Sequence, residues 1–414
     1  MGRVREHDVV IVGARVAGAS LAILLARQGR SVLLLDREEF PSDTLSTHYV
    51  HPFGVANLAR LGLLDDLLAA GFRRLTRIRT HVEDCLFEAP VAPAGGFGLA
   101  PRRSVLDALL QEHAVAAGAE LLTRTRAEGL VEEDGRVVGV VATDGAGERR
   151  ELRARLVVGA DGKTSKFAEW VSAAAYREMG PLRPVYYGYY RGVTPLQEPA
   201  VELYYGGDTI GFLFPMRESE DCLALEVQPA EFDEFRADPQ GAFEERYRAL
   251  HGMEARFRGA TLEGKLQGTK GVANFLRVPY GPGWALTGDA AYLKDPVTGF
   301  GIGDAVAQAL MLARPVGTWL DGSDWEATMS AYHAKRDETL LPLYELTLGL
   351  ALMQDPPPET IDRLRGFFAM ASNVRTLAHT LPANLATLLP PGPAALVEQT
   401  AELFAQDRAG ASSP

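Results

Sequence analysis

The most regular pattern of apolar and polar positions lies near the start of the chain, between Asp8 and Arg37. A β-branched run over residues 9–12 is followed by a glycine, a small-residue apolar segment over 17–26, and a second apolar run that ends at Asp36. Short apolar runs indicate buried strands, and the longer segment between them indicates a helix. The order predicts a strand, a helix and a second strand, which is the unit that holds a dinucleotide.

Helical and strand-like patterns alternate through the rest of the first half. Apolar residues at helical spacing predict helices over 55–70 and 103–118. Residues 120–143 predict strands joined by a tight turn, and 156–158 predict a short buried strand that leads into a glycine-rich segment. This alternation is typical of an α/β domain with a parallel sheet.

The pattern changes between residues 185 and 227, where short runs rich in aromatic and β-branched residues are separated by Pro, Gly and Asp. Such runs indicate an antiparallel sheet. We therefore predict an α/β fold, in which a Rossmann-like domain carries an inserted antiparallel-sheet substrate domain and C-terminal helices. The expected boundaries are residues 1–75, 99–170 and 272–345 for the Rossmann-like domain, 76–98 and 171–271 for the inserted domain, and 346–414 for the C-terminal helical region.

Composition narrows the class of protein. The chain has 414 residues, 47% of them hydrophobic and 23% charged, which is ordinary for a globular protein of two domains. A net charge of −12 argues against a nucleic-acid binder or a binder of anionic membranes. Cys85 and Cys222 cannot build a disulfide framework and have no metal-ligand spacing, so we expect no metal site. The first apolar segment is interrupted by Arg15 and ends at Arg27, so we expect a cytoplasmic protein without a membrane span.

The turn after the first strand carries the sequence GARVAG. Gly13 permits the tight turn, and Gly18 lets the helix approach the strand. Arg15 replaces the middle glycine of the usual fingerprint, and it either adds a cation near the phosphates or spoils the site. Asp36 is placed to accept hydrogen bonds from a ribose, beside Arg37. A buried strand and helix without a ligand is the alternative interpretation of this segment.

Three further landmarks follow in order. Arg103 opens a helix with leucines at positions 106 and 110, GADG with a serine three residues later occupies 159–165, and GDAAYLKDPVTGFG occupies 288–301. Together with the first turn, these motifs resemble the FAD-dependent monooxygenases of the para-hydroxybenzoate hydroxylase fold, over nearly the whole chain up to about residue 336.

The resemblance implies a role for each motif. The first turn and Asp36 would hold the ADP half of FAD, and Arg103 would reach the pyrophosphate or ribityl chain. Asp161 would lie near FAD and the route of the nicotinamide cofactor, Asp289 would bond the ribityl hydroxyls, and Pro296 would lie beside the flavin ring. The implied cofactor-binding set is Gly13, Ala14, Arg15, Ala17, Gly18, Asp36, Arg37, Arg103, Asp161, Gly288, Asp289, Pro296, Gly299 and Gly301.

The last glycine-rich loop can also be interpreted from physical principles alone. Gly299, Gly301 and Gly303 allow the backbone to approach a flat ring closely. They precede a predicted helix over 304–313, whose positive end would face an anionic reduced flavin. A helix start with a flexible turn is the alternative.

The family resemblance favours a monooxygenase that uses NAD(P)H and O2. It would oxidise a small aromatic or polyene (alkene) substrate through a flavin hydroperoxide, as a monomer or homodimer. Rings on the second sheet could line the pocket or form sheet core; they are Tyr187, Tyr189, Phe212 and Phe214. Tyr292 and Gly303 depart from the usual histidine and asparagine of the hydroxylases, so the reaction is less secure than the flavin.

Three other functions remain open. Lys294-Asp295-Pro296 resembles the loop of prenyl-chain (geranylgeranyl) reductases and of flavin-dependent halogenases. The halogenase is the less favoured of these two, because the four tryptophans form no W-x-W-x-I-P motif. The third alternative is a flavin-binding protein without turnover.

The acid–base residues are the least determined part of the site. The segment over residues 43–52 lies where relatives run past the flavin, and either His48 or His51 could donate to a substrate or the flavin. A structural role is the alternative for both. The predicted catalytic set is His48, Lys294 and Pro296.

Overall fold

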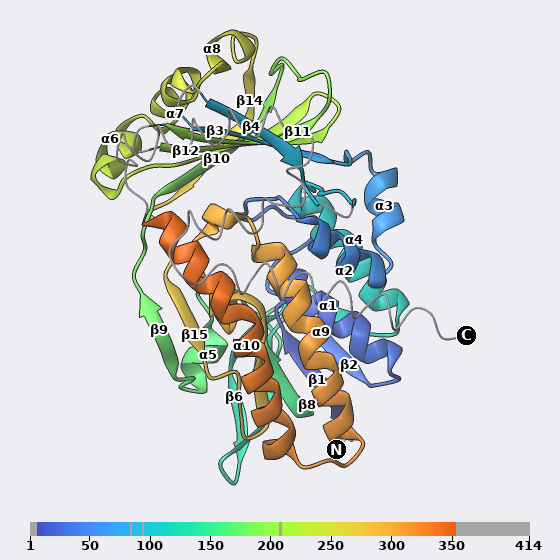
Figure 1. Cartoon of the computed structure of the whole chain (residues 1–414). Helices are drawn as coiled ribbons and strands as arrows, with labels where there is room; N and C mark the ends of the chain where they lie inside the picture. The colour runs from blue at the N-terminus through green and yellow to red at the C-terminus, as the bar shows by residue number, and fades with distance from the viewer. Residues whose placement is uncertain (1–5, 83–84, 93–94, 207–208, 353–414) are drawn as a thin grey trace.

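The structure is a computed structural model that describes residues 6–82, 85–92, 95–206 and 209–352. Two main sheets lie one above the other in Figure 1, and helices pack against a face of each. The predicted C-terminal helical region, residues 346–414, lies outside the described residues except for residues 346–352.

The first sheet has eight strands, and its main path runs β16-β17-β8-β1-β2-β5. β1 lies in the middle and pairs in parallel with β2 on one side and β8 on the other, while α1 connects β1 to β2. This confirms the predicted strand–helix–strand unit. The strands are β1 (Glu6–Val12), β2 (Val32–Leu35), β5 (Glu120–Leu122), β6 (Arg126–Glu133), β7 (Arg136–Thr143), β8 (Arg149–Gly159), β16 (Tyr280–Gly281) and β17 (Trp284–Leu286).

Helices pack against this sheet because each presents an apolar face. α1 contacts both α4 and α9, and α9 also contacts α2 and α10. The predicted helix over 55–70 is two helices, because Gly62 adopts a left-handed φ of 89° between them. The helices are α1 (Val16–Arg27), α2 (Pro52–Arg60), α3 (Leu64–Ala69), α4 (Arg103–Ala116), α5 (Lys166–Trp170), α9 (Gly301–Leu320) and α10 (Trp325–Ala351).

The second sheet has seven strands in the order β14-β10-β13-β12-β11-β3-β4. It confirms the predicted antiparallel layer, although β3 and β11 pair in parallel. The alternating pattern of residues 78–88 predicts one strand, whereas the structure has the two antiparallel strands β3 and β4 there. The strands are β3 (Arg77–Val82), β4 (Cys85–Pro90), β10 (Val185–Arg191), β11 (Ala200–Gly206), β12 (Thr209–Arg217), β13 (Glu220–Glu226) and β14 (Thr261–Thr269).

The two faces of the second sheet have different partners. One face packs under α6 (Phe232–Ala237), α7 (Pro239–Ala249) and α8 (Met253–Arg256), at the top of Figure 1. Rings on the opposite face, including Tyr187 and Phe212, belong to the same buried cluster as α1 and α9. The second sheet therefore presents an aromatic face to the Rossmann-like domain.

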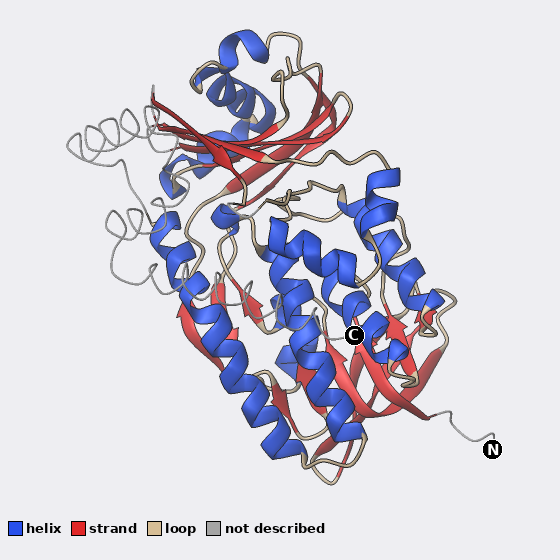
Figure 2. Cartoon of the chain, turned by 45° about the vertical axis from the view of Figure 1, so that its right-hand side comes forward, coloured by secondary structure: helices blue, strands red, loops and turns tan. Residues whose placement is uncertain are grey.

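A small third sheet connects the layers. Its central strand is β15 (Asn274–Arg277), which pairs with β9 (Ala175–Met179) and β18 (Tyr292–Leu293). Figure 2 shows α10 as one long helix, so the boundary predicted at residue 345 falls inside a helix. No helix among the described residues is long and apolar enough to cross a membrane.

Candidate flavin site

The turn between β1 and α1 has no space for larger side chains at its two glycines. Gly13 adopts a φ of 107°, and a Cβ there would lie 2.4 Å from the carbonyl oxygen of Ala160. A Cβ on Gly18 would lie 1.9 Å from the carbonyl oxygen of Gly13. Arg15 has a φ of −91°, so its position needs no glycine. The departure from the usual fingerprint is therefore compatible with the turn.

The side chain of Arg15 points toward α4. Its Nη1 donates to Oδ2 of Asp107 at 2.7 Å, and its Nη2 donates to Ser42 Oγ at 2.9 Å. Arg103 donates from Nε and Nη2 to the same carboxylate at 3.0 Å each. Asp107 is fully buried, so two guanidinium groups share one carboxylate and leave a net positive charge beside the turn. That charge suits a pyrophosphate.

Two of these anchoring residues are absent from the predicted set. Asp107 fixes both arginines, and Gln111 donates from Nε2 to the carbonyl oxygen of Ala14 at 2.9 Å. A signal exists in the sequence, because Asp107 lies four residues after Arg103 and therefore on the same helix face. A charged residue on an otherwise apolar face is a reason to expect a paired role.

Asp36 ends β2 and faces the same turn. Its Oδ2 accepts from the amide of Ala14 at 2.8 Å, and its Oδ1 accepts from the amide of Glu38 at 2.9 Å. A carboxylate oxygen has a second lone pair, so both oxygens can still accept from ribose hydroxyls. The neighbouring Arg37 is exposed and pairs with Glu38, and its role in binding stays a prediction.

Asp161 already uses both of its oxygens. One accepts from Ser165 Oγ, and the other accepts from the amide of Phe167 at 3.0 Å, at the start of α5. Ser165 in turn caps that helix by accepting from the amide of Ala168. These bonds give Asp161 a local structural role, and its predicted place near FAD stays a prediction.

Unlike Asp36 and Asp161, Asp289 has a carboxylate that accepts no hydrogen bond from the described residues. It lies in the short turn η2 (Gly288–Ala290). Burial and charges, but no hydrogen bond, act on its carboxyl group among the described residues. Gly288 adopts a φ of 63°, and a Cβ there would lie 2.5 Å from Cβ of Ala17, so small residues let this turn approach α1. Burial raises the pKa of Asp289, whereas the charges of Arg103 and Lys294 lower it. An unpartnered carboxylate beside α1 fits the hydroxyls of a ribityl chain.

The start of α9 is open toward one side. Pro296 begins the turn η3 (Pro296–Thr298), Gly299 follows with a φ of 67°, and Gly301 is the first residue of α9. A Cβ built on Gly301 would meet no atom within 4 Å. The backbone there can contact a flat ring directly, and the positive end of α9 faces it. The residues of this site therefore fit FAD.

Lys294 does not stand free beside that loop. Its ammonium group forms a buried ion pair with Asp304, in the first turn of α9, and lies 4.7 Å from the ring centroid of Tyr292. Its predicted catalytic role is not tested by these contacts. The ion pair ties the loop to α9, which is a positioning role.

His51 supports the same loop from the other side. Its Nε2 donates to the carbonyl oxygen of Thr298 at 2.9 Å, and its ring stacks on Phe300 with centroids 3.8 Å apart. His51 therefore ties the start of α2 to residues 296–301, which we call the flavin loop. Burial lowers the pKa of His51 to about 4, helped by the charge of Lys294, although the bond to Thr298 raises it.

His48 belongs to a buried chain of hydrogen bonds. Its Nε2 lies 2.7 Å from Tyr189 Oη, and its Nδ1 lies 3.5 Å from Cys222 Sγ. Tyr189 donates in turn to Asp43 at 3.3 Å. Burial, together with the charges of Arg103 and Arg102, lowers the pKa of His48 to about 3, so the ring is neutral near pH 7.

The neutral histidines predict a loss of stability in acid. The pKa of His51 is 6.5 in the unfolded chain and about 4 in the fold, so the unfolded state binds more protons as the pH falls below 6.5. At about pH 5 this lowers the free energy of unfolding by about 2 kcal/mol. His51→Gln removes that contribution, so its stability should fall less than that of the wild type between about pH 7 and about pH 5. Urea unfolding at both pH values measures the difference, and equal losses in the two proteins would contradict it.

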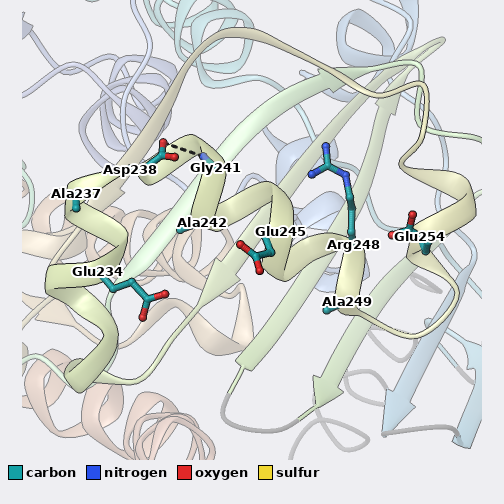
Figure 3. A pocket seen from close by; sticks show the side chains of 9 residues that line it. All are labelled: Glu234, Ala237, Asp238, Gly241, Ala242, Glu245, Arg248, Ala249 and Glu254. Atoms are coloured by element: carbon teal, nitrogen blue, oxygen red, sulfur yellow. Dashed lines mark hydrogen bonds between the residues drawn. The ribbon is translucent and has the colours of Figure 1, made fainter.

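The open groove in Figure 3 is a separate feature. It lies on α6, α7 and α8, on the side of the second sheet that faces away from the flavin loop. Four carboxylates and several small residues line it, and none belongs to the four sequence landmarks. The lining residues are Glu234, Ala237, Asp238, Gly241, Ala242, Glu245, Arg248, Ala249 and Glu254.

The curated relatives are named for three different reactions. The chain is 25% identical over 348 residues to a 1H-pyrrole-2-carbonyl-(peptidyl-carrier protein) brominase of Pseudoalteromonas luteoviolacea, covering 80% of this chain and 82% of that protein. It is 27% identical over 309 residues to a digeranylgeranylglycerophospholipid reductase of Methanosarcina acetivorans, covering 72% of each. It is 27% identical over 384 residues to a rifampicin monooxygenase of Streptomyces venezuelae, covering 89% of this chain and 76% of that protein.

Solved structures share the fold. A flavin-dependent brominase superposes with a TM-score of 0.78 at 20% identity, covering 97% of this chain and 100% of that one. An aklavinone-11 hydroxylase in complex with FAD and aklavinone superposes with a TM-score of 0.70 at 23% identity, covering 83% of this chain and 68% of that one.

The family model described as FAD binding domain matches residues 6–341, which include all four sequence landmarks. The match confirms the family resemblance inferred from those motifs, and with it the FAD cofactor. The protein therefore belongs to the FAD binding domain family and is an FAD-dependent oxidoreductase.

Proposed function

We propose that this protein is a monooxygenase that uses NAD(P)H and O2 to hydroxylate or epoxidise a small aromatic or polyene metabolite. When bound, FAD would accept a hydride from the nicotinamide and activate oxygen. The residues of this chain would hold the flavin, orient the substrate against it and exclude water. The choice between a monooxygenase, a halogenase and a reductase rests on the residues that surround the flavin loop.

The observation that carries the proposal is the way residues 43–51 join the second sheet to that loop. Tyr49 stacks on Phe214 of β12 with ring centroids 5.5 Å apart, and both rings are almost fully buried. Two residues later, His51 stacks on Phe300 and bonds to the loop. An aromatic, water-poor surface beside the flavin loop suits oxygen transfer, in which water must be kept out.

Two features weigh against the other reactions. A halogenase needs a lysine that can hold hypohalous acid, but Lys294 lies in a different place from the halogenase lysine, and its ammonium group is paired with Asp304. Many prenyl-chain reductases carry cysteine-containing segments that this sequence lacks, and burial raises the pKa of the Cys222 thiol, which disfavours a reactive thiolate. A brominating enzyme is the second candidate, because a brominase is among both the curated relatives and the solved structures.

Product analysis distinguishes the three reactions. The purified holoenzyme is mixed with NADH or NADPH in air and a panel of phenols and polyenes, each with and without bromide. The proposal expects products that gain oxygen, whether or not bromide is present. Brominated products would support the halogenase instead, and alkene saturation without oxygen would support the reductase.

His48 provides a prediction for turnover. His48→Ala removes the bonds to Tyr189 and Cys222 on the aromatic face and leaves the bonds of Arg15, Asp36 and Arg103 in place. We expect substrate-dependent NAD(P)H oxidation to slow by roughly tenfold or more, because general acid–base groups commonly contribute about 10²–10⁴-fold. FAD content should stay equal to that of the wild type. Unchanged kinetics would leave His48 with a structural role only.

A further inference from the structure

A buried carboxyl group faces the Rossmann-like domain from the last position of β13. Glu226 pairs in register with Val185 of β10 and Ile210 of β12. Side chains alternate along a strand, so Glu226 shares its face with Ala224, which belongs to the buried cluster that includes α1 and α9. Glu226 therefore lies on the aromatic inner face, not on the face covered by α6–α8.

Among the described residues, the carboxyl group of Glu226 has no hydrogen-bond partner: its exposed fraction is 0%, and neither of its oxygens is bonded. Asp295, which directly precedes Pro296, is 1% exposed and is close enough for its charge to raise the pKa of Glu226. One oxygen of Asp295 accepts from the amide of Val297, and the other also lacks a partner. Three buried carboxyl oxygens are thus unpaired between the second sheet and the flavin loop.

The charges around this pair determine what it can bind. Burial raises the pKa of Glu226, repulsion from Asp295 raises it further, and Arg183 lowers it. Burial also raises the pKa of Asp295, which Arg183 again lowers. On the second sheet, Glu226 raises the pKa of Tyr205, so that phenol is also close. Because burial raises both pKa values and Arg183 is the cation named for both groups, a proton on one of the two carboxyl groups is favoured.

Nothing in the fold requires a glutamate at this position. A buried polar group without a partner destabilises a protein, typically by about 1–3 kcal/mol. An apolar side chain on the inner face of β13 would avoid that penalty. Unpaired buried polar groups that persist in a stable fold point to a role in binding or chemistry.

We propose that Glu226, with Asp295, forms the polar end of the substrate site and binds the hydroxyl group of an aromatic substrate. This inference rests on the proposed function, since it places the substrate against the Pro296 turn. A carboxyl group that holds a proton and an adjacent carboxylate can donate to and accept from one hydroxyl. A substrate carboxylate would meet like charge there. The rings of Tyr187 and Phe212 on the same face would contact the apolar part of the substrate.

Binding of a matched pair of probes tests this assignment without turnover. The oxidised holoenzyme is titrated with 2-naphthol and with 2-methylnaphthalene, which have similar shapes, and the change in flavin absorbance is followed. We expect the wild type to bind the naphthol at least about tenfold more tightly. Glu226→Met should bring the two affinities close to equality, and Glu226→Gln should retain part of the preference.

Two controls separate recognition from folding. Glu226→Met should keep its FAD and have a Tm no lower than the wild type, because it removes an unpaired buried carboxyl group. Asp221→Asn lies on the same strand but points to the other face, and it should keep the full preference. An unchanged preference in Glu226→Met, or a wild type that binds neither probe or both equally, would overturn the assignment. Because no catalysis is measured, a failure of the monooxygenase proposal would appear separately, in the product analysis.

Discussion

Gly18→Ala is expected to abolish FAD binding and to destabilise the protein by about 3 kcal/mol or more. The new Cβ would lie 1.9 Å from the carbonyl oxygen of Gly13, which is backbone and cannot rotate away. α1 would have to move off the β1 turn, and with it the amides that face the pyrophosphate. Thermal unfolding and the ratio of FAD to protein after purification measure both effects.

Gly301→Ala is the matched control, because the same change is made at a glycine with open space. A Cβ there meets no protein atom within 4 Å, so the Tm of the protein without FAD should equal that of the wild type. FAD affinity should still fall, because the methyl group would occupy the place of the flavin ring. A Gly301→Ala protein with normal FAD affinity would mean that the ring does not lie against the start of α9.

Asp289→Leu is expected to weaken FAD binding by roughly 100-fold, without a loss of stability in the absence of FAD. Hydrogen bonds to a charged group contribute about 1.5–3 kcal/mol, and within the described part of the chain Asp289 has no side-chain hydrogen bond that would be lost. Two bonds to ribityl hydroxyls account for a change of this size. Fluorescence titration of the FAD-free protein with FAD measures the affinity.

Asp161→Asn gives the opposite pattern and serves as the comparison. Its carboxylate accepts from Ser165 and from the amide of Phe167, so the change should lower the Tm more than it lowers FAD affinity. A loss of FAD affinity as large as that of Asp289→Leu would place Asp161 in direct contact with the cofactor. Normal affinity in Asp289→Leu would contradict the ribityl assignment.

The sequence predicted the parts of the fold that follow local rules. The strand–helix–strand unit around Gly13 and Gly18 could be predicted because its turn needs glycine and its strands are continuous apolar runs. The aromatic second sheet could be predicted because its short aromatic and β-branched runs are separated by Pro, Gly and Asp. The break at Gly62 and the hairpin of β3 and β4 were not predicted, because an apolar pattern alone does not show where one element becomes two.

The candidate site could be predicted where a motif fixes it, and less well where contacts between distant segments do. Asp289 and the Gly299–Gly301 turn follow from motifs, and their contact with the flavin stays a prediction. Asp107 was missed because its importance depends on Arg15, which is 92 positions away in the chain. Glu226 was missed because the charge of Asp295, which acts on it, comes from a segment distant in the chain.

These contacts combine into one physical picture of the proposed reaction. The Rossmann-like domain would hold FAD by backbone amides, a shared positive charge around Asp107, and the carboxylate of Asp289, which accepts no hydrogen bond from the described residues. The second sheet faces the flavin loop with buried rings and a neutral His48. Substrate binding between them would exclude water before oxygen reacts.

The most direct test of the monooxygenase proposal is the fate of isotopically labelled dioxygen. The holoenzyme is mixed with NADPH or NADH and with a substrate from the product analysis, under labelled oxygen in ordinary water. The mass of the product is then measured by mass spectrometry. The proposal predicts one labelled oxygen atom in each product molecule. A product whose new oxygen comes from water, or a product that forms equally well without oxygen, would contradict it.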